Sequence, residues 1–193
     1  MPRRPPGYAW HASQVIELGA GAVGRPSLVA AISGGLGTRV TITDKHPELV
    51  SRLRATIEAN GLGGQCSAQA YTWGAPRPDD ESEQGSLPRS AHDLILSADC
   101  LYSCETAGAF VEALEDLVGP NTRVLICCEE RWSRRECLEI LQDRGWTATQ
   151  LGGARRLTAT QAATIQRHAL ESGSGECFLY SLARSSSASL HKS

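Results

Sequence analysis

Short apolar runs alternate with longer stretches of helical periodicity along most of the chain. Seven runs have the length and the β-branched or wholly apolar character of strands, at 15–18, 39–43, 66–73, 93–98, 123–128, 147–151 and 176–182. Apolar residues recur with helical spacing between them, in 26–36, 47–60, around 110–118, in 133–144 and near 159–170. The chain therefore alternates strands with helices.

The ends of these helices carry local signals. The spacing of three apolar residues predicts one face of the first helix: Leu28, Val29 and Ile32. Asn60-Gly61 predicts a left-handed stop for the second helix. Ser133 with Glu136 has the spacing of a capping box at the start of a later helix.

Strands that alternate with helices of this length predict a doubly wound α/β fold with a mostly parallel, seven-stranded sheet. We expect one domain over 14–184, after a short extension at 1–13 and before a disordered tail at 185–193. The polar, proline-rich stretch at 74–92 predicts a mobile loop inside that domain. In such sheets, ligands bind at the carboxyl ends of the strands.

Composition narrows the class of protein. Apolar residues make up 41% of the chain, which excludes disorder throughout, and the net charge is −2, from 19 basic and 21 acidic residues. This balance predicts no general attraction to nucleic acid or to a membrane surface, and no apolar stretch approaches the length of a membrane span. The oligomeric state is not determined by these features.

Seven cysteines are present, without a C-x-x-C pair. An odd number of cysteines, placed mostly in apolar runs, predicts reduced thiols in the cytoplasm, with the nucleus as a second possibility. Their spacing does not suit a tetrahedral metal site, so we expect buried thiols and no metal.

Glycines follow the first strand at Gly19, Gly21 and Gly24, and Asp44 ends the second strand 20 residues after the last of them. Glycines let a backbone approach a ligand closely, and an acidic side chain in this place accepts both hydroxyls of a ribose. The pair predicts a cofactor that contains adenosine. The alternative is an ordinary glycine turn and an aspartate that caps a helix.

Glu17 stands two residues before the first glycine. A carboxylate there would repel a pyrophosphate, whereas it can receive an ammonium group through the loop or an ordered water. S-adenosylmethionine carries such an ammonium and a dinucleotide does not. In the alternative interpretation, Glu17 only accepts hydrogen bonds from backbone amides of the turn.

Five segments together resemble a known family: VIELGAG at 15–21, VTITD at 40–44, TWG at 72–74, DLILSADCLY at 93–102 and LICCEERW at 125–132. They resemble class I methyltransferases of the methyltransferase-like family 16, which methylate protein lysines, over about residues 14 to 150. The resemblance implies S-adenosylmethionine as cofactor and a protein lysine as substrate.

The resemblance also implies a role for individual residues. It puts Glu17, Gly19 and Gly21 on the methionine side of the cofactor, Asp44 on the ribose and Trp73 on the adenine, with Ala98 as a further cofactor contact. It puts Asp99 and Tyr102 beside the methyl group and the incoming amine.

The position of Asp99 and Tyr102 just after a buried strand agrees with these roles. Methyl transfer is an in-line displacement that depends mainly on alignment and desolvation. A lysine is protonated at neutral pH, so Asp99 would accept or guide its proton, and the ring of Tyr102 would favour the cationic species. The alternatives are that Asp99 caps the next helix, that Tyr102 packs on it, and that Trp73 is only an edge-packing residue.

Members of this family begin with a tryptophan-containing segment and a helix that cover the cofactor. Trp10 precedes Val15 by only five residues, so we expect this cover to be missing and the cofactor pocket to be open. Two other functions stay open at this point. The glycines and Asp44 also fit an NAD-dependent oxidoreductase, and a missing cover fits a catalytically impaired interaction module.

Overall fold

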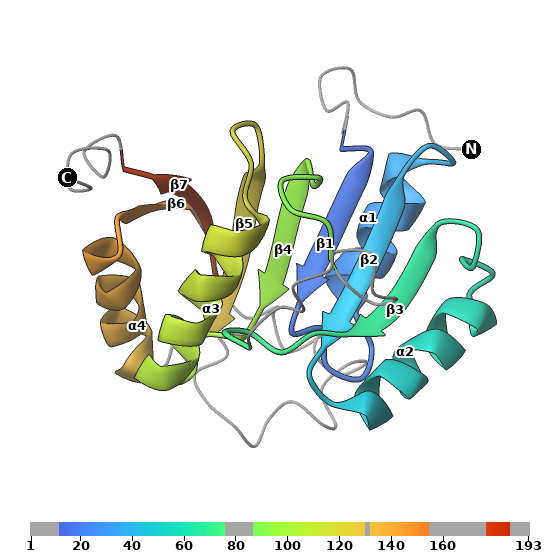
Figure 1. Ribbon diagram of the computed structural model, residues 1–193, viewed down its shortest axis with the longest axis horizontal. Coiled ribbons are helices and arrows are strands. Elements are labelled where there is room, and N and C mark those ends of the chain that lie inside the picture. The colour runs from blue at the N-terminus through green and yellow to red at the C-terminus, as the bar shows by residue number, and fades with distance from the viewer. Residues whose placement is uncertain (1–11, 76–86, 130–131, 155–176, 186–193) are drawn as a thin grey trace.

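The computed structural model describes residues 12–75, 87–129, 132–154 and 177–185. Within them the elements follow one another as shown in Figure 1: β1 (Gln14–Leu18), α1 (Arg25–Gly34), β2 (Arg39–Asp44), α2 (Pro47–Ala59), β3 (Cys66–Ala70), β4 (Leu94–Ala98), α3 (Cys104–Leu117), β5 (Arg123–Glu129), α4 (Trp132–Asp143), β6 (Trp146–Ala154) and β7 (Cys177–Arg184).

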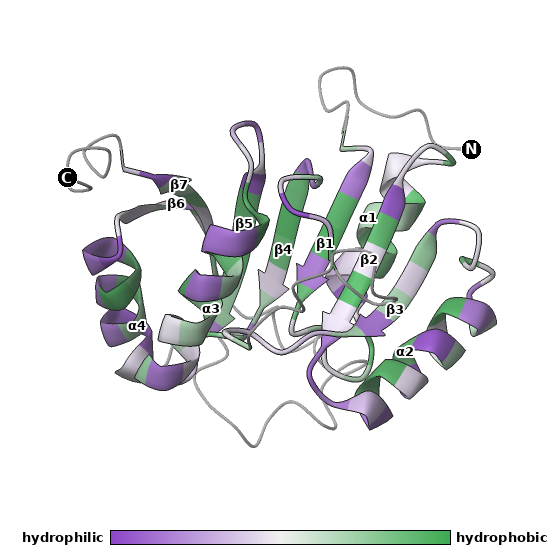
Figure 2. Cartoon of the chain, in the orientation of Figure 1, coloured by the Kyte–Doolittle hydropathy of each residue, from purple (hydrophilic) through white to green (hydrophobic). Residues whose placement is uncertain are grey.

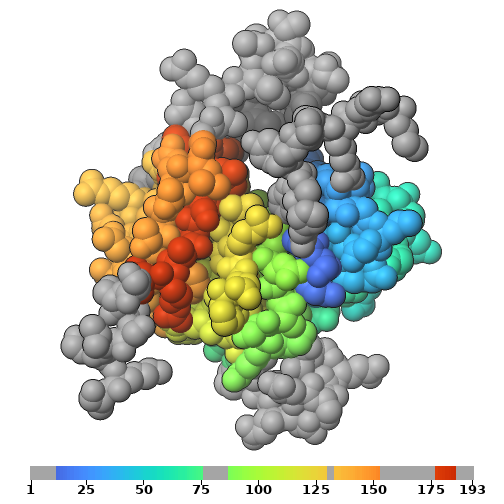
Figure 3. All heavy atoms as spheres, turned by 90° about the horizontal axis from the view of Figure 1, so that it is seen from above, coloured from blue at the N-terminus to red at the C-terminus, as the bar shows by residue number. Residues whose placement is uncertain are grey.

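The strands form a seven-stranded sheet in the order β3-β2-β1-β4-β5-β7-β6. The pairs among β1 to β5 are parallel, and β7 is antiparallel to both β5 and β6. Seen from above in Figure 3, orange β6 and red β7 lie on one side and blue and light-blue β1 and β2 on the other. The doubly wound, mostly parallel seven-stranded sheet expected from the sequence is confirmed.

Consecutive strand residues bury their side chains in two separate cores. On one face, Ile16 packs with α3 residues such as Phe110 and Leu114. On the other face, Val15 packs with α2 residues such as Leu53. Figure 2 shows mostly green, hydrophobic segments in the central strands, and green alternating with purple along α2, α3 and α4. A strand that is apolar on both faces requires helices on both sides, which is why the runs at β1 and β4 lack alternation.

The predicted left-handed stop after α2 is confirmed. Gly61 has φ +66°, and its amide donates to the Glu58 carbonyl at 3.0 Å while the Leu62 amide donates to the Ile57 carbonyl at 3.0 Å. These two bonds satisfy the last carbonyls of the helix. The chain then enters β3, which pairs parallel with β2.

The face predicted for α1 is right for Leu28, which packs against the core, and wrong for Val29 and Ile32. Val29 and Ile32 are 62% and 64% exposed, whereas the buried residues of this helix are Ser27, Ala30 and Ala31. Small side chains let the helix lie close against the parallel strands, and the larger residues then point outward. Hydrophobicity alone therefore gives the wrong orientation for Val29 and Ile32.

The capping box is not formed either. Ser133 lies inside α4, which already includes Trp132, and its hydroxyl donates to the Tyr102 carbonyl at 3.1 Å. The Glu136 carboxylate accepts a hydrogen bond from Cys104 Sγ at 3.7 Å. Both side chains thus join α4 to the start of α3.

Several boundaries differ from expectation. The third strand ends at Ala70, so Tyr71 to Trp73 belong to the following turn. Leu87 and His92, inside the predicted loop 74–92, are buried. Trp10, the helix near 159–170, the middle of that loop at 76–86 and the tail from 186 lie outside the described residues. The domain limits and the missing cover stay predictions. No helix in the described ranges has the length and apolar character needed to cross a membrane.

Candidate functional site

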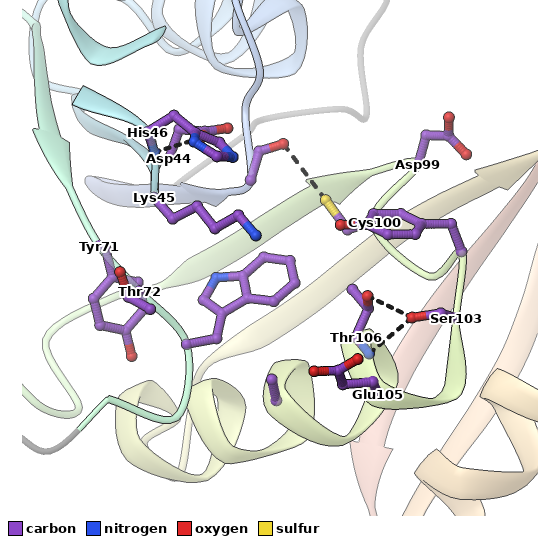
Figure 4. Close-up of a pocket in the computed structure, with 14 residues that line it drawn as sticks. Asp44, Lys45, His46, Tyr71, Thr72, Asp99, Cys100, Ser103, Glu105 and Thr106 are labelled. Carbon is purple, nitrogen blue, oxygen red and sulfur yellow. Dashed lines mark hydrogen bonds between the residues drawn. The ribbon is translucent and has the colours of Figure 1, made fainter. Parts of the chain in front are cut away.

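A cavity of about 490 Å³ opens at the carboxyl ends of β1 to β4. Figure 4 shows the residues that line it, which come from the strand ends, the turn after β3 and the first turns of α3. The lining residues are Gly19, Asp44, Lys45, His46, Tyr71, Thr72, Trp73, Asp99, Cys100, Tyr102, Ser103, Glu105, Thr106 and Ala109. We call this the carboxyl-edge cavity. Its volume is that of a typical small-molecule site.

Five of the residues singled out from the sequence line this cavity: Gly19, Asp44, Trp73, Asp99 and Tyr102. Glu17, Gly21 and Ala98 lie within two residues of lining residues in the sequence but do not line the cavity themselves. Residues as far apart in the sequence as Gly19 and Tyr102 thus meet at one edge, as the parallel order of the strands requires.

The glycine turn after β1 approaches the turn after β4 very closely. Gly19 has φ +67°, and a Cβ added to it would lie 2.6 Å from Cys100 Sγ and 3.0 Å from the ring of Trp73. Only glycine fits such a position without displacing both neighbours. Gly21 is also left-handed, at φ +64°, but a Cβ there would meet no atom within 4 Å.

Asp44 ends β2 and ties three backbone segments together. Its Oδ2 accepts a hydrogen bond from the Gly21 amide at 2.9 Å, and its Oδ1 accepts one from the His46 amide at 3.0 Å. Each carboxylate oxygen has a further lone pair, so these bonds leave capacity to accept hydroxyl groups. Asp44 is therefore both a support of the glycine turn and an acceptor at the cavity wall.

Glu17 is 1% exposed and lies beneath the glycine turn. Its Oε2 accepts a hydrogen bond from the Ser27 amide, in the first turn of α1, at 3.0 Å. Burial raises the pKa of Glu17 from 4.5 to about 7, and the hydrogen bond from the Ser27 amide offsets part of that shift. The carboxylate thus accepts a backbone amide, and its contact with a cofactor ammonium stays a prediction.

Asp99 directly follows β4 and lines the cavity with an exposed side chain. It has φ +56°, a left-handed conformation that aspartate tolerates better than most residues. Its amide donates to the Cys127 carbonyl on β5 at 2.7 Å. This bond fixes the turn that carries Asp99 to the end of the neighbouring strand.

Tyr102 lies three residues further along the same turn, with its side chain 52% exposed. The Ser133 hydroxyl holds its carbonyl at 3.1 Å. Ser103 then begins α3, since its Oγ accepts a hydrogen bond from the Thr106 amide at 3.1 Å. It is therefore Ser103, and not Asp99, that caps this helix, while the exposed Asp99 lines the cavity.

Cys100 is buried between the two turns, and its Sγ donates to the Leu18 carbonyl at 3.3 Å and to the Gly19 carbonyl at 3.5 Å. Burial raises the pKa of this thiol to about 11. Each of the seven cysteines is a free thiol. Among the described residues, no group of three or more histidine, cysteine, aspartate or glutamate side chains is arranged to hold a metal ion.

Trp73 packs its ring edge-to-face against Phe110 of α3, with centroids 5.3 Å apart and planes at 69°. The same ring lies against Gly19 and lines the cavity. Trp73 thus has both a packing partner in the core and a surface toward the cavity. Its contact with an adenine stays a prediction.

The sequence analysis missed several lining residues, notably Lys45, His46, Ser103, Glu105 and Thr106. Two signals point to them. Lys45 and His46 directly follow the end of β2, and Ser103 with Thr106 opens a helix right after the Asp99 turn. These residues, like the acidic ones, lie at or after strand ends that meet at the cavity.

Comparison with known proteins places this geometry among methyltransferases. A family model described as lysine methyltransferase matches residues 6–142. The protein N-lysine methyltransferase METTL21A of Danio rerio is 39% identical over 126 residues, which are 64% of this chain and 52% of that protein. The METTL21A protein of Mus musculus is 30% identical over 139 residues, 70% of this chain and 58% of that protein. The chain spans about half the length of these relatives.

Solved structures show the same fold at lower identity. A methyltransferase from Pyrococcus furiosus superposes with a TM-score of 0.59 at 16% identity, over 91% of this chain and 75% of that chain. A SAM-dependent methyltransferase from Aquifex aeolicus gives a TM-score of 0.57 at 19% identity, over 88% of this chain and 81% of that chain. These similarities confirm the expected class I arrangement of the sheet.

Proposed function

The chain belongs to the lysine methyltransferase family, and from this premise we propose that it transfers a methyl group from S-adenosylmethionine to a lysine side chain of a protein. The observation that carries the proposal is the carboxyl-edge cavity, whose lining brings together Gly19, Asp44, Asp99 and Tyr102. The family match favours this function over that of a nicotinamide-dependent oxidoreductase.

The residues present fit an adenosyl group. Gly19 forms a cradle that any side chain would fill, since a Cβ would collide with Cys100 and Trp73. Asp44 keeps free lone pairs for a ribose, and Trp73 offers an aromatic surface beside it. We expect Asp44, Gly19 and Trp73 to hold the nucleoside, with Glu17, Gly21 and Ala98 as supporting residues.

When bound, the cofactor supplies an electrophilic methyl group on a positively charged sulfur. The chain's contribution is to align the amine and to manage its proton. Asp99, exposed at the cavity and not engaged as a helix cap, is positioned to accept that proton or to pass it to solvent. Tyr102 presents its ring at the same rim, where it favours a cationic amine.

Transfer in one step, without a covalent enzyme intermediate, agrees with the state of the nearest thiol. Because the pKa of Cys100 is raised to about 11, its sulfur is protonated at neutral pH and is a poor nucleophile. In addition, the thiol proton is donated in hydrogen bonds to the Leu18 and Gly19 carbonyls. Cys100 is a structural residue in this proposal.

The acceptor class rests on the relatives, which include METTL21A proteins and an EEF1A lysine methyltransferase 3 of Mus musculus, 33% identical over 119 residues, 61% of this chain and 46% of that protein. We propose a protein lysine rather than a nucleic acid, because the net charge is −2. Seven free thiols support a reducing compartment, for which we propose the cytoplasm.

The test is methyl transfer from a labelled donor. Purified protein is incubated with labelled S-adenosylmethionine and a cell extract, and the proteins are separated and digested to locate label on lysine. We expect a labelled protein band that the Asp99→Asn variant does not produce. Binding of NADH in place of S-adenosylhomocysteine would favour the oxidoreductase, and a protein that captures partners but binds neither nucleoside would favour an interaction module.

A further inference from the structure

Lys45 is one of very few lysines in this chain. The chain has 19 basic residues, of which only Lys45 and Lys192 are lysines, and Lys192 lies outside the described residues. Arginine supplies every other basic side chain. The lysine that the structure describes lies directly after Asp44 and lines the carboxyl-edge cavity.

The Lys45 side chain extends from the end of β2 into the cavity. Figure 4 shows its ammonium directed toward Cys100, which follows β4. Within the described part of the chain, no carboxylate is within ion-pair distance of it, whereas neighbouring His46 lies 3.5 Å from Glu48. Lys45, which is in no direct ion pair with the described residues, therefore presents its positive charge to whatever occupies the cavity.

The proposed donor and its product differ in charge at one atom. S-adenosylmethionine has a sulfonium, and S-adenosylhomocysteine has a neutral thioether with the same base, ribose and amino acid. A fixed cation in the cavity raises the energy of the first relative to the second, because like charges repel more strongly when little water separates them. The two ligands share the base, the ribose and the amino acid, so protein contacts to these groups cancel in the ratio of the two dissociation constants.

We propose that Lys45 is a specificity-determining residue that shifts the cavity's preference away from the sulfonium donor and toward the neutral product. It works against the cavity's three carboxylates, Asp44, Asp99 and Glu105, which favour the sulfonium. The consequence is product inhibition that is stronger than the carboxylates alone would give. This inference rests on the proposed function.

The test is calorimetric titration of S-adenosylmethionine and S-adenosylhomocysteine, each without acceptor, into the wild type and four variants. Lys45→Met and Lys45→Gln remove the charge, Lys45→Arg keeps it, and Arg52→Met removes an exposed charge on α2 that does not line the cavity. Lys45 is exposed, so both neutral variants are expected to fold. Far-ultraviolet circular dichroism checks this directly.

We expect the donor-to-product ratio of dissociation constants to fall about five-fold in both neutral variants, an order of magnitude set by Coulomb interaction at a partly exposed site. The Arg variant and Arg52→Met should keep the wild-type ratio. Equal weakening of both nucleosides, or an unchanged ratio, overturns this inference while leaving the proposed function standing. Failure of the wild type to bind either nucleoside overturns the proposed function and this inference with it.

Discussion

The carboxylate of Glu17 accepts a hydrogen bond from the amide of Ser27 at 3.0 Å, in a position that is 1% exposed to solvent. The bond joins the end of β1 to the first turn of α1 beneath the glycine turn. We expect a buried acid in this place to make both folding and cofactor binding sensitive to pH.

We expect Glu17→Gln to stabilise the protein above neutral pH. Burial raises the pKa of Glu17 from 4.5 to about 7, so between these values the folded protein holds a proton that the unfolded chain has released. Wild-type stability therefore falls as pH rises from 4.5 to about 7 and is level beyond. Glutamine has no proton to lose and still accepts the Ser27 amide.

Urea unfolding at pH 5 and pH 8 measures this effect. The stability difference in favour of Glu17→Gln should grow by on the order of 3 kcal/mol over the full interval. Equal slopes of stability against pH in the two proteins would show that Glu17 titrates normally. A matching exposed variant, Glu58→Gln on α2, should leave the slope of the wild type unchanged.

The same residue gives a separate prediction for ligand binding. An ammonium group attracts Glu17 only when the carboxylate is ionised, so affinity for S-adenosylhomocysteine should rise between pH 6 and pH 8 in the wild type. The glutamine variant should lose this rise. Wild-type affinity that does not change with pH would leave Glu17 with the structural role of accepting backbone amides alone.

Two glycines provide a matched pair for the close approach of the turns. Gly21→Ala should cost about 1 to 2 kcal/mol of stability, because alanine disfavours the left-handed conformation. Gly19→Ala should cost a further 1 to 3 kcal/mol, because its Cβ would also lie 2.6 Å from Cys100 Sγ. Adding Cys100→Ala to Gly19→Ala should recover part of the loss. Equal unfolding free energies for the two single variants would contradict the close packing.

Asp99→Asn tests the proton acceptor. Asparagine tolerates the left-handed backbone of this position, so the fold and the affinity for S-adenosylhomocysteine should stay near the wild-type values. Methyl transfer should fall about 100-fold, the lower end of the loss usual for a missing acid–base group. Tyr102→Phe, which keeps the ring, should retain most activity. Wild-type turnover in Asp99→Asn would remove the carboxylate from the mechanism.

The outward side of α1 gives a prediction about stability. Ile32→Gln should change the free energy of unfolding by less than about 0.5 kcal/mol, because the side chain is 64% exposed. Ala31→Gln, one residue earlier and fully buried, should cost at least about 2 kcal/mol, since it forces a larger polar group into the core. Chemical denaturation of both variants measures the contrast, and a similar loss in each would mean that Ile32 is buried in solution.

The success of the sequence analysis differs among elements for physical reasons. β1 and β4 were found because they are buried on both faces and are mainly apolar, without alternation of apolar and polar residues. The stop at Gly61 was found because it depends on two adjacent residues. Such local and strongly apolar patterns predict structure well because they do not depend on contacts between distant segments.

The predictions that were wrong or missing concern features that depend on contacts between distant segments. Ala30 and Ala31 are buried because α1 lies close to the sheet. The sequence of the helix does not show how close to the sheet it packs. Ser133 looks like a helix cap, but the turn at Tyr102, 31 residues earlier, takes its hydroxyl. Lys45 was overlooked because only the strand order brings it to the same cavity as Asp99.

Calorimetric titration of S-adenosylhomocysteine into the wild type and Asp44→Asn tests the central claim most directly, namely that Asp44 and the glycine turn form a site for an adenosyl group. We predict one bound nucleoside per chain in the wild type. Loss of a charged hydrogen-bond acceptor, worth about 1.5 to 3 kcal/mol, should weaken binding roughly ten- to hundred-fold in the folded variant. A wild type that binds nothing, or a variant that binds equally well, would contradict the account.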